Sequence, residues 1–109
     1  MKRISYLLFA LPLFILSCKS TPEANFSVTA IAFEVGQEIF FQNNSSDAKN
    51  YEWDFGDGYI SNESNPSHIF NANGSFEIIL TAISKKGLES KASIILSPLR
   101  KVGATGLVN

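Results

Sequence analysis

The sequence predicts an all-β fold, a two-layer sandwich of about seven antiparallel strands. Short segments in which apolar and polar residues alternate recur along most of the chain, separated by turn residues every 8–12 positions. The clearest alternation, at residues 51–55, puts three aromatic side chains on one face, and these rings need a facing layer to cover them. Beyond residue 17 no stretch shows a helical period.

The first seventeen residues are predicted to be a secretory signal peptide. Lys2 and Arg3 precede an apolar run at residues 6–16, which is too short to span a bilayer, since a helix needs about 20 residues for that. The run ends in Ile15-Leu16-Ser17-Cys18, which resembles the lipobox of bacterial lipoproteins. The resemblance implies cleavage before Cys18 and attachment of acyl chains, such as palmitate, to that residue.

Cys18 is the only cysteine, so the chain can form no internal disulfide. The alternative is an ordinary cysteine that is removed with the signal peptide. Because two or more acyl chains anchor a protein stably, an acylated Cys18 would hold the chain on a membrane of the bacterial cell envelope, at the outer membrane or cell surface. The polar residues 18–24 then form a lipidated tether.

One small domain is expected over residues 25–97, since the remaining length leaves no room for a second core. The predicted strands span residues 26–32, 38–42, 49–55, 67–70, 75–84 and 89–96. Residues 59–65 are polar and irregular, and Pro66 is compatible only with an edge strand. The tail at 98–109 lies outside the pattern and is expected to be disordered or to add an edge strand.

The octapeptide at residues 51–58, Tyr-Glu-Trp-Asp-Phe-Gly-Asp-Gly, is the most informative segment. Its alternation predicts that Trp53 and Phe55 point into the core. Gly56 and Gly58 then supply the positive φ angles of a tight reversal, with Asp57 between them.

This segment resembles the signature of the polycystic kidney disease (PKD) domain, an immunoglobulin-like β-sandwich. The resemblance extends in order and spacing to other elements of the family pattern. These are Gly36, the core Trp53-Asp54-Phe55-Gly56-Asp57-Gly58, the segment Asn65-Pro66-Ser67-His68-Ile69-Phe70, and Gly74 two residues before Phe76. This sequence departs mildly from the family pattern, because Phe70 and Phe76 stand where the family usually has Tyr. The resemblance implies an accessory module that contacts proteins or polysaccharides.

Asp54 and Asp57 are open to three interpretations. Their oxygens can accept backbone N–H bonds within the turn, which the resemblance favours; they are weaker candidates for Ca²⁺ ligands, and weaker still for an acid–base pair. His68, the only histidine, is expected to be structural and to hydrogen-bond a neighbouring loop. The sequence has no second histidine that could act as a general base for a Ser or Cys nucleophile, and it has no set of three metal ligands. We therefore expect neither an enzyme nor a cofactor.

The net charge and the residues predicted to be exposed indicate which kinds of partner the chain can bind. Loss of residues 1–17 leaves seven basic and ten acidic residues without a basic stripe, so nucleic acid is not an expected partner. Phe40, Ile79 and Ile83 are predicted to face outward, where they either form a contact patch or are covered by the tail or a side loop. Tyr59 is the clear exposed aromatic, and one ring favours a protein partner over a polysaccharide, which stays the alternative.

Overall fold

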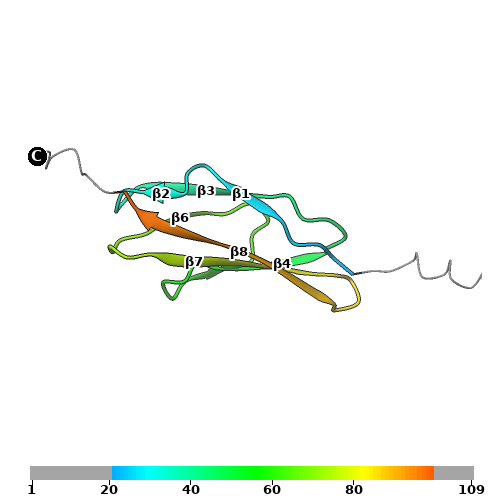
Figure 1. Ribbon diagram of the computed structural model, residues 1–109. Helices are drawn as coiled ribbons and strands as arrows, with labels where there is room; N and C mark the ends of the chain where they lie inside the picture. The colour runs from blue at the N-terminus through cyan, green and yellow to red at the C-terminus, as the bar shows by residue number, and fades with distance from the viewer. Residues whose placement is uncertain (1–20, 100–109) are drawn as a thin grey trace, which may run out of the picture.

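The computed structural model describes residues 21–99, and they form two β-sheets packed face to face (Figure 1). The three-stranded sheet has the order β1-β3-β6 and consists of β1 (Phe26–Val28), β3 (Glu38–Asn43) and β6 (Ser67–Ile69). The five-stranded sheet has the order β2-β8-β7-β4-β5 and consists of β2 (Ala32–Phe33), β4 (Asn50–Asp54), β5 (Ile60–Ser61), β7 (Phe76–Ile83) and β8 (Glu89–Pro98). The predicted sandwich is therefore confirmed.

The first predicted strand, residues 26–32, is in fact two short strands in different sheets. β1 pairs antiparallel with β3, whereas β2 pairs with β8 in parallel, so the expectation of purely antiparallel strands is wrong at this pair. The chain crosses between the layers at residues 29–31. This crossing lets Phe26 and Val28 pack on the core from one sheet, and lets Phe33, which has no exposed surface, fill it from the other.

Two other boundaries differ from the prediction. The irregular segment 59–65 contains β5, which pairs with the end of β4 as an edge strand. β8 continues two residues past its predicted end, to Pro98. The first residue of β7, Phe76, is opposite Leu96, so Pro98 lies beyond β7, where no N–H is needed to pair with that strand. The signal peptide, Cys18 and residues 100–109 of the predicted tail lie outside the described residues.

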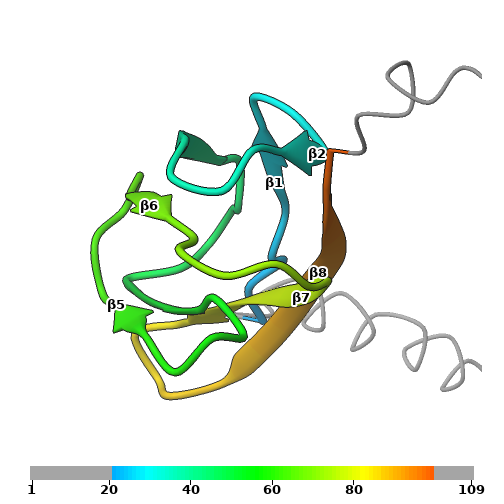
Figure 2. The ribbon, with the colours of Figure 1, turned by 90° about the vertical axis from the view of Figure 1, so that its left-hand side faces the viewer.

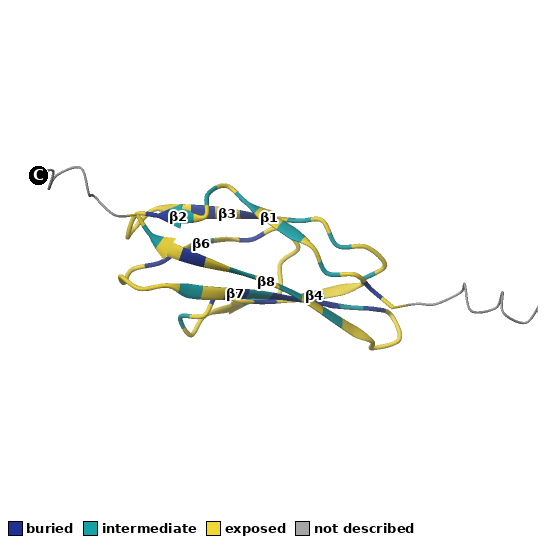
Figure 3. Ribbon diagram, viewed as in Figure 1, coloured by how far each residue is buried: buried dark blue, intermediate teal, exposed yellow. Residues whose placement is uncertain are grey.

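The core is a layer of aromatic and aliphatic side chains between the sheets, seen as dark blue bands in Figure 3. Trp53 is fully buried, as the alternation predicts; its ring meets Phe26 edge-on at 5.0 Å and lies 5.5 Å from Phe41, and its Nε1–H donates to the Glu63 carbonyl at 2.9 Å. The buried hydrophobic residues, all at most 2% exposed, are Phe33, Ile39, Phe41, Trp53, Phe55, Phe70, Ile78, Leu80, Ala82 and Leu96.

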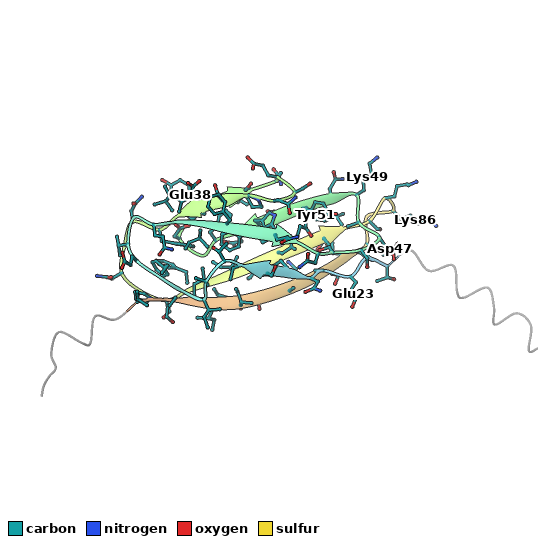
Figure 4. The ribbon with its side chains drawn as sticks, turned by 90° about the horizontal axis from the view of Figure 1, so that it is seen from above. Glu23, Glu38, Asp47, Lys49, Tyr51 and Lys86 are labelled. Atoms are coloured by element: carbon teal, nitrogen blue, oxygen red, sulfur yellow. The ribbon has the colours of Figure 1, made fainter. Side chains whose placement is uncertain are left out.

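The sandwich has two distinct ends. At the N-terminal end, Glu23 pairs with Ser46 and the turn at residues 84–88 joins β7 to β8. At the opposite end, here called the far end, lie the loops 34–37, 55–59 and 71–75, and Leu99 donates to the Phe33 carbonyl. Figure 4 shows Glu38 toward the far end and Lys49 and Lys86 toward the N-terminal end. Within residues 21–99, no helix is long and apolar enough to cross a membrane.

Candidate functional site

The glycine-rich turn after β4 shapes the far end of the sandwich. The turn is closed by Phe55, whose N–H donates to the Tyr59 carbonyl at 3.1 Å. Gly56 and Gly58 have φ angles of +79° and +98°, in the left-handed region that favours glycine. A Cβ on Gly56 would lie 2.7 Å from the Glu77 carbonyl oxygen, so only glycine lets the turn approach β7 this closely.

The carboxylates of the turn are engaged within the protein. Asp54 Oδ1 accepts the Gly56 N–H at 2.9 Å, and Asp57 Oδ1 accepts the Tyr59 N–H at 3.2 Å. Asp57 Oδ2 lies 2.7 Å from His68 Nε2. Three of the four carboxylate oxygens therefore have partners, which supports the turn interpretation over Ca²⁺ or acid–base chemistry. No cluster of three or more metal-binding side chains occurs within residues 21–99.

His68 joins the two sheets at their open side. It sits on edge strand β6, and its partner Asp57 follows β4 in the other sheet; Figure 2 shows β5 and β6 on this side, in different layers. The imidazole stacks on Phe55 with centroids 4.2 Å apart and an angle of 4°, and it meets Phe70 edge-on at 4.7 Å. This close packing between aromatic rings indicates a structural role for His68. Its hydrogen bond to Asp57 agrees with the expected contact between His68 and a neighbouring loop.

A shallow depression opens beside this pair at the far end. Its floor and walls are formed by Asp57, Tyr59, Ile69, Asn71, Ala72 and Phe76. Tyr59 is 66% exposed, and the centroid of its ring lies 5.6 Å from that of His68. The exposed ring therefore packs on one side against the histidine that is bound to Asp57. Ile69 is 42% exposed on the outer face of β6. The depression thus combines an aromatic ring and an aliphatic wall with a carboxylate and an amide.

The three outward apolar residues predicted to share a patch do not meet. Phe40 is 54% exposed on β3, in the three-stranded sheet, beside a second depression lined by Phe40, Phe41, Gln42, Asn65 and Pro66. Ile79 and Ile83 are half-buried on β7, in the five-stranded sheet. Since the core separates the outer faces of the two sheets, Phe40 faces away from the isoleucines, and a single patch, one of the two alternatives, does not form.

Sequence reasoning identified Tyr59 but missed the other walls of its depression. Ile69 could have been found, because it alternates with the inward-facing His68 and Phe70 and must therefore point outward. Asn71 and Phe76 come from segments separated by the Asn-Gly turn at Gly74, whose φ is +135°. Their convergence with Asp57 depends on how the loops of the two sheets meet, and no local pattern encodes that.

Several sequence-predicted family residues have structural roles away from the depression. Gly36, with φ of +90°, donates its N–H to the Phe70 carbonyl at 2.9 Å and so ties the 34–37 turn to the strand that carries His68. Pro66 is buried and its carbonyl accepts the Phe41 N–H at 3.0 Å. These contacts position β6, and hence His68 and Ile69, against β3.

Comparisons with known proteins agree with this architecture. Over 62 residues the chain is 37% identical to collagenase ColA of Bacillus cereus, an alignment that covers 52% of the chain and 6% of the collagenase, so the chain matches only a small part of that relative. It superimposes with a TM-score of 0.70 and 22% identity, over 74% of the chain, on 35% of a chain whose structure is described under carbohydrate-binding modules from the β-sandwich superfamily. At that identity the likeness concerns the fold alone.

Another solved structure is a single domain and is more similar in sequence to the chain than the preceding solved structure is. The PKD1 domain of the Vibrio cholerae metalloprotease PrtV is 30% identical, with a TM-score of 0.57, over 71% of the chain and 98% of that domain. The model of the family described as PKD domain matches residues 19–96, which includes the glycine-rich turn, His68 and every described strand except the last residues of β8. The chain therefore belongs to the PKD domain family.

Proposed function

We propose that this chain is a non-catalytic binding module, held at the bacterial cell envelope by an acylated Cys18, that contacts a protein partner through the depression at its far end. The signal-like run at residues 6–16 and the lipobox-like Ile15-Leu16-Ser17-Cys18 support the anchor. The engagement of Asp54, Asp57 and His68 by one another and by backbone supports a module without a catalytic set.

The placement of the depression carries the proposal. The described chain enters the sandwich at the N-terminal end, next to the 44–49 loop and the 84–88 turn, whereas β6 and the loops that line the depression lie toward the far end (Figure 1). A tether at the N-terminal end would present the far end away from the membrane. Exposed Tyr and aliphatic side chains in a depression with a polar rim are typical of the centre of a protein interface.

A polysaccharide is the alternative ligand, and one feature favours it. The Tyr59 ring lies beside Asp57 and Asn71, an arrangement in which a sugar could stack on the ring while its hydroxyls reach the polar side chains. Sugar platforms usually expose more than one ring. The other strongly exposed aromatic of residues 21–99, Phe40, lies on the three-stranded sheet and lines a different depression. The collagenase relatives, enzymes named for a protein substrate, also favour a protein partner.

The partner is tested by site-specific photocrosslinking of the full chain in intact cells. A photoreactive residue at Ile69 should capture a distinct protein, and the Tyr59→Ala change should abolish that product. The same probe at Lys86, on the opposite end, is the matched control. Equal capture from both positions, or a glycan array on which wild type binds and Tyr59→Ala does not, would reject the protein partner.

The anchor is tested separately by cell fractionation. The wild-type chain should sediment with membranes, and Cys18→Ser should shift it to the soluble fraction or leave an unprocessed precursor of higher mass. Recovery of a processed Cys18→Ser protein in the membrane fraction, as for wild type, would contradict the anchor. Protease treatment of intact cells then distinguishes a surface location from a periplasmic one.

A further inference from the structure

A second surface, distinct from the depression, lies on the outer face of the five-stranded sheet. Strand register places Ile60, Asp54, Ile79 and Ser93 in one row across β5, β4, β7 and β8. Ile95 is directly opposite Glu77 and is the diagonal neighbour of Ile79, a separation of about 7–8 Å in antiparallel sheets. We name Ile60, Ile79 and Ile95 the isoleucine stripe. Ile60 and Ile95 are 61% and 63% exposed.

Carboxylates predominate among the charges around the stripe. Asp54 lies between Ile60 and Ile79, and Glu77 lies beside Ile95, so each isoleucine has a carboxylate as its cross-strand neighbour or next to it. The nearest described cation of this face, Lys91, lies opposite Thr81 and is also a diagonal neighbour of Ile79, but a third carboxylate, Glu52, lies opposite Thr81 from the other side. Within residues 21–99 the only ion pair is that of His68 with Asp57, so no lysine of this part of the chain is paired with the carboxylates of the stripe.

The exposed isoleucines and the carboxylates beside them favour one of three possible ligands of the stripe. A second copy of the chain, packed face to face on the stripe, would bring Asp54 and Glu77 against their own counterparts, and like charges at an interface are unfavourable. A polysaccharide would find no aromatic ring on the outer face of β4, β7 and β8. A protein segment that carries aliphatic and cationic side chains on one face satisfies both requirements, because its apolar groups cover the isoleucines while its lysines or arginines reach the carboxylates.

We infer that the isoleucine stripe is a docking surface for a basic, aliphatic protein segment. The inference is independent of the far-end depression and goes beyond the function proposed for it. Alternate residues of an extended chain are about 6.8 Å apart, which is comparable to the diagonal spacing of Ile79 and Ile95, so an extended segment fits the stripe.

The test uses the full acylated chain in nanodiscs of phosphatidylcholine, a lipid without net charge. The probe is a short fluorescent peptide in which Lys and Leu take turns at every second position, with Ser between them, so that both share one face of the extended chain. It is compared with matching Glu–Leu and Lys–Ser peptides, and binding is followed by anisotropy. The Lys–Leu peptide should bind best. Glu77→Lys and Ile95→Ser should each weaken it roughly tenfold, since one removes a complementary charge and the other an apolar anchor.

Two matched variants localise the effect. Glu38→Lys makes the same change of charge on the three-stranded sheet, and Tyr59→Ala alters the depression; both should leave binding unchanged. A carbodiimide, which couples amines to carboxylates that touch them, should link the peptide to Asp54 or Glu77. A loss of binding in Tyr59→Ala alone would move the peptide to the depression and overturn the inference.

Other results would also overturn it. These are equal binding of the Glu–Leu peptide, absence of Lys–Leu binding, and coupling at Glu34 or Glu38 instead of Asp54 or Glu77. Concentration-dependent dimers that Ile95→Ser abolishes would assign the stripe to a second copy. Coupling of Asp54 or Glu77 to Lys101 of the same chain would assign it to the chain's own C-terminal segment.

Discussion

The inner and outer faces of β4 and β7 differ in almost every respect although they belong to the same strands. On the inner face Trp53 and Leu80 are opposite each other and have no exposed surface. On the outer face the next pair, Asp54 and Ile79, borders solvent. Since successive side chains of a strand point to opposite faces, one short sequence specifies both the core and the surface that is left for contact.

The difference teaches where to expect structural and where to expect functional effects. The inner face is aromatic and closely packed, and any lost volume leaves a cavity. The outer face mixes isoleucines with carboxylates, and changes there should alter binding while the fold remains. The same contrast holds at the far end, where Phe55 and His68 support an exposed Tyr59.

The largest effect should come from the inner face. Trp53→Ala removes a fully buried ring that contacts Phe26 and Phe41, and such truncations cost about 3–5 kcal/mol. Domains have a free energy of unfolding of only about 5–15 kcal/mol, so the variant should be barely folded. The measurement is urea denaturation followed by circular dichroism. The outer-face control, Ile95→Ala, should change stability by less than about 0.5 kcal/mol; equal losses in both variants would remove the contrast between the faces.

A second prediction concerns the two glycines of the turn. Both have positive φ, but only Gly56 has β7 backbone within reach of a Cβ, whereas nothing lies within 4 Å of a Cβ on Gly58. Gly58→Ala should therefore show the cost of the backbone conformation alone, about 1 kcal/mol. Gly56→Ala adds a clash with the Glu77 carbonyl and should cost about 2–3 kcal/mol. Urea midpoints in the reverse order would show that the turn, not its approach to β7, is the constraint.

A third prediction tests the link between the sheets. His68→Ala removes the stacking on Phe55 and the hydrogen bond to Asp57, which together should contribute about 1.5–2.5 kcal/mol. His68→Phe should recover the part that is due to stacking. Asp57→Asn keeps an acceptor oxygen for His68 and should cost less than His68→Ala. If His68→Ala melts like wild type, the pair does not hold the two sheets together.

Much of the fold could be predicted because its determinants are local. The alternation around Trp53, the glycine turn and the Asn-Gly turn place β3, β4, β6, β7 and β8 within a few residues of where they lie. The split of residues 26–32 could not be predicted, since the same alternation suits one long strand or two short ones. Its resolution depends on partners distant in sequence, Asn43 for Phe26 and Ser97 for Ala32.

The candidate site was harder to predict for the same reason. Exposure of Tyr59 followed from its position after a turn, but the walls of its depression come from two separate loops and from the strands β6 and β7. Phe40 and Ile79 were grouped because alternation reports only which face of a strand a residue occupies, not which sheet the strand joins. The register that aligns Ile60, Ile79 and Ile95 likewise needs the strand order of the five-stranded sheet.

The smallest expected effect is that of calcium. Ca²⁺ needs six to eight oxygen ligands, and Asp54 and Asp57 already use three carboxylate oxygens on Gly56, Tyr59 and His68. A ligand that binds the native state raises stability in proportion to the logarithm of its concentration over Kd, so without a site Tm should not depend on the ion. Millimolar CaCl2 should therefore shift Tm no more than MgCl2 does. A calcium-specific rise that Asp57→Asn abolishes would mean that the turn exchanges its hydrogen bonds for a metal, and the carboxylates would then belong with the functional surface and not with the core.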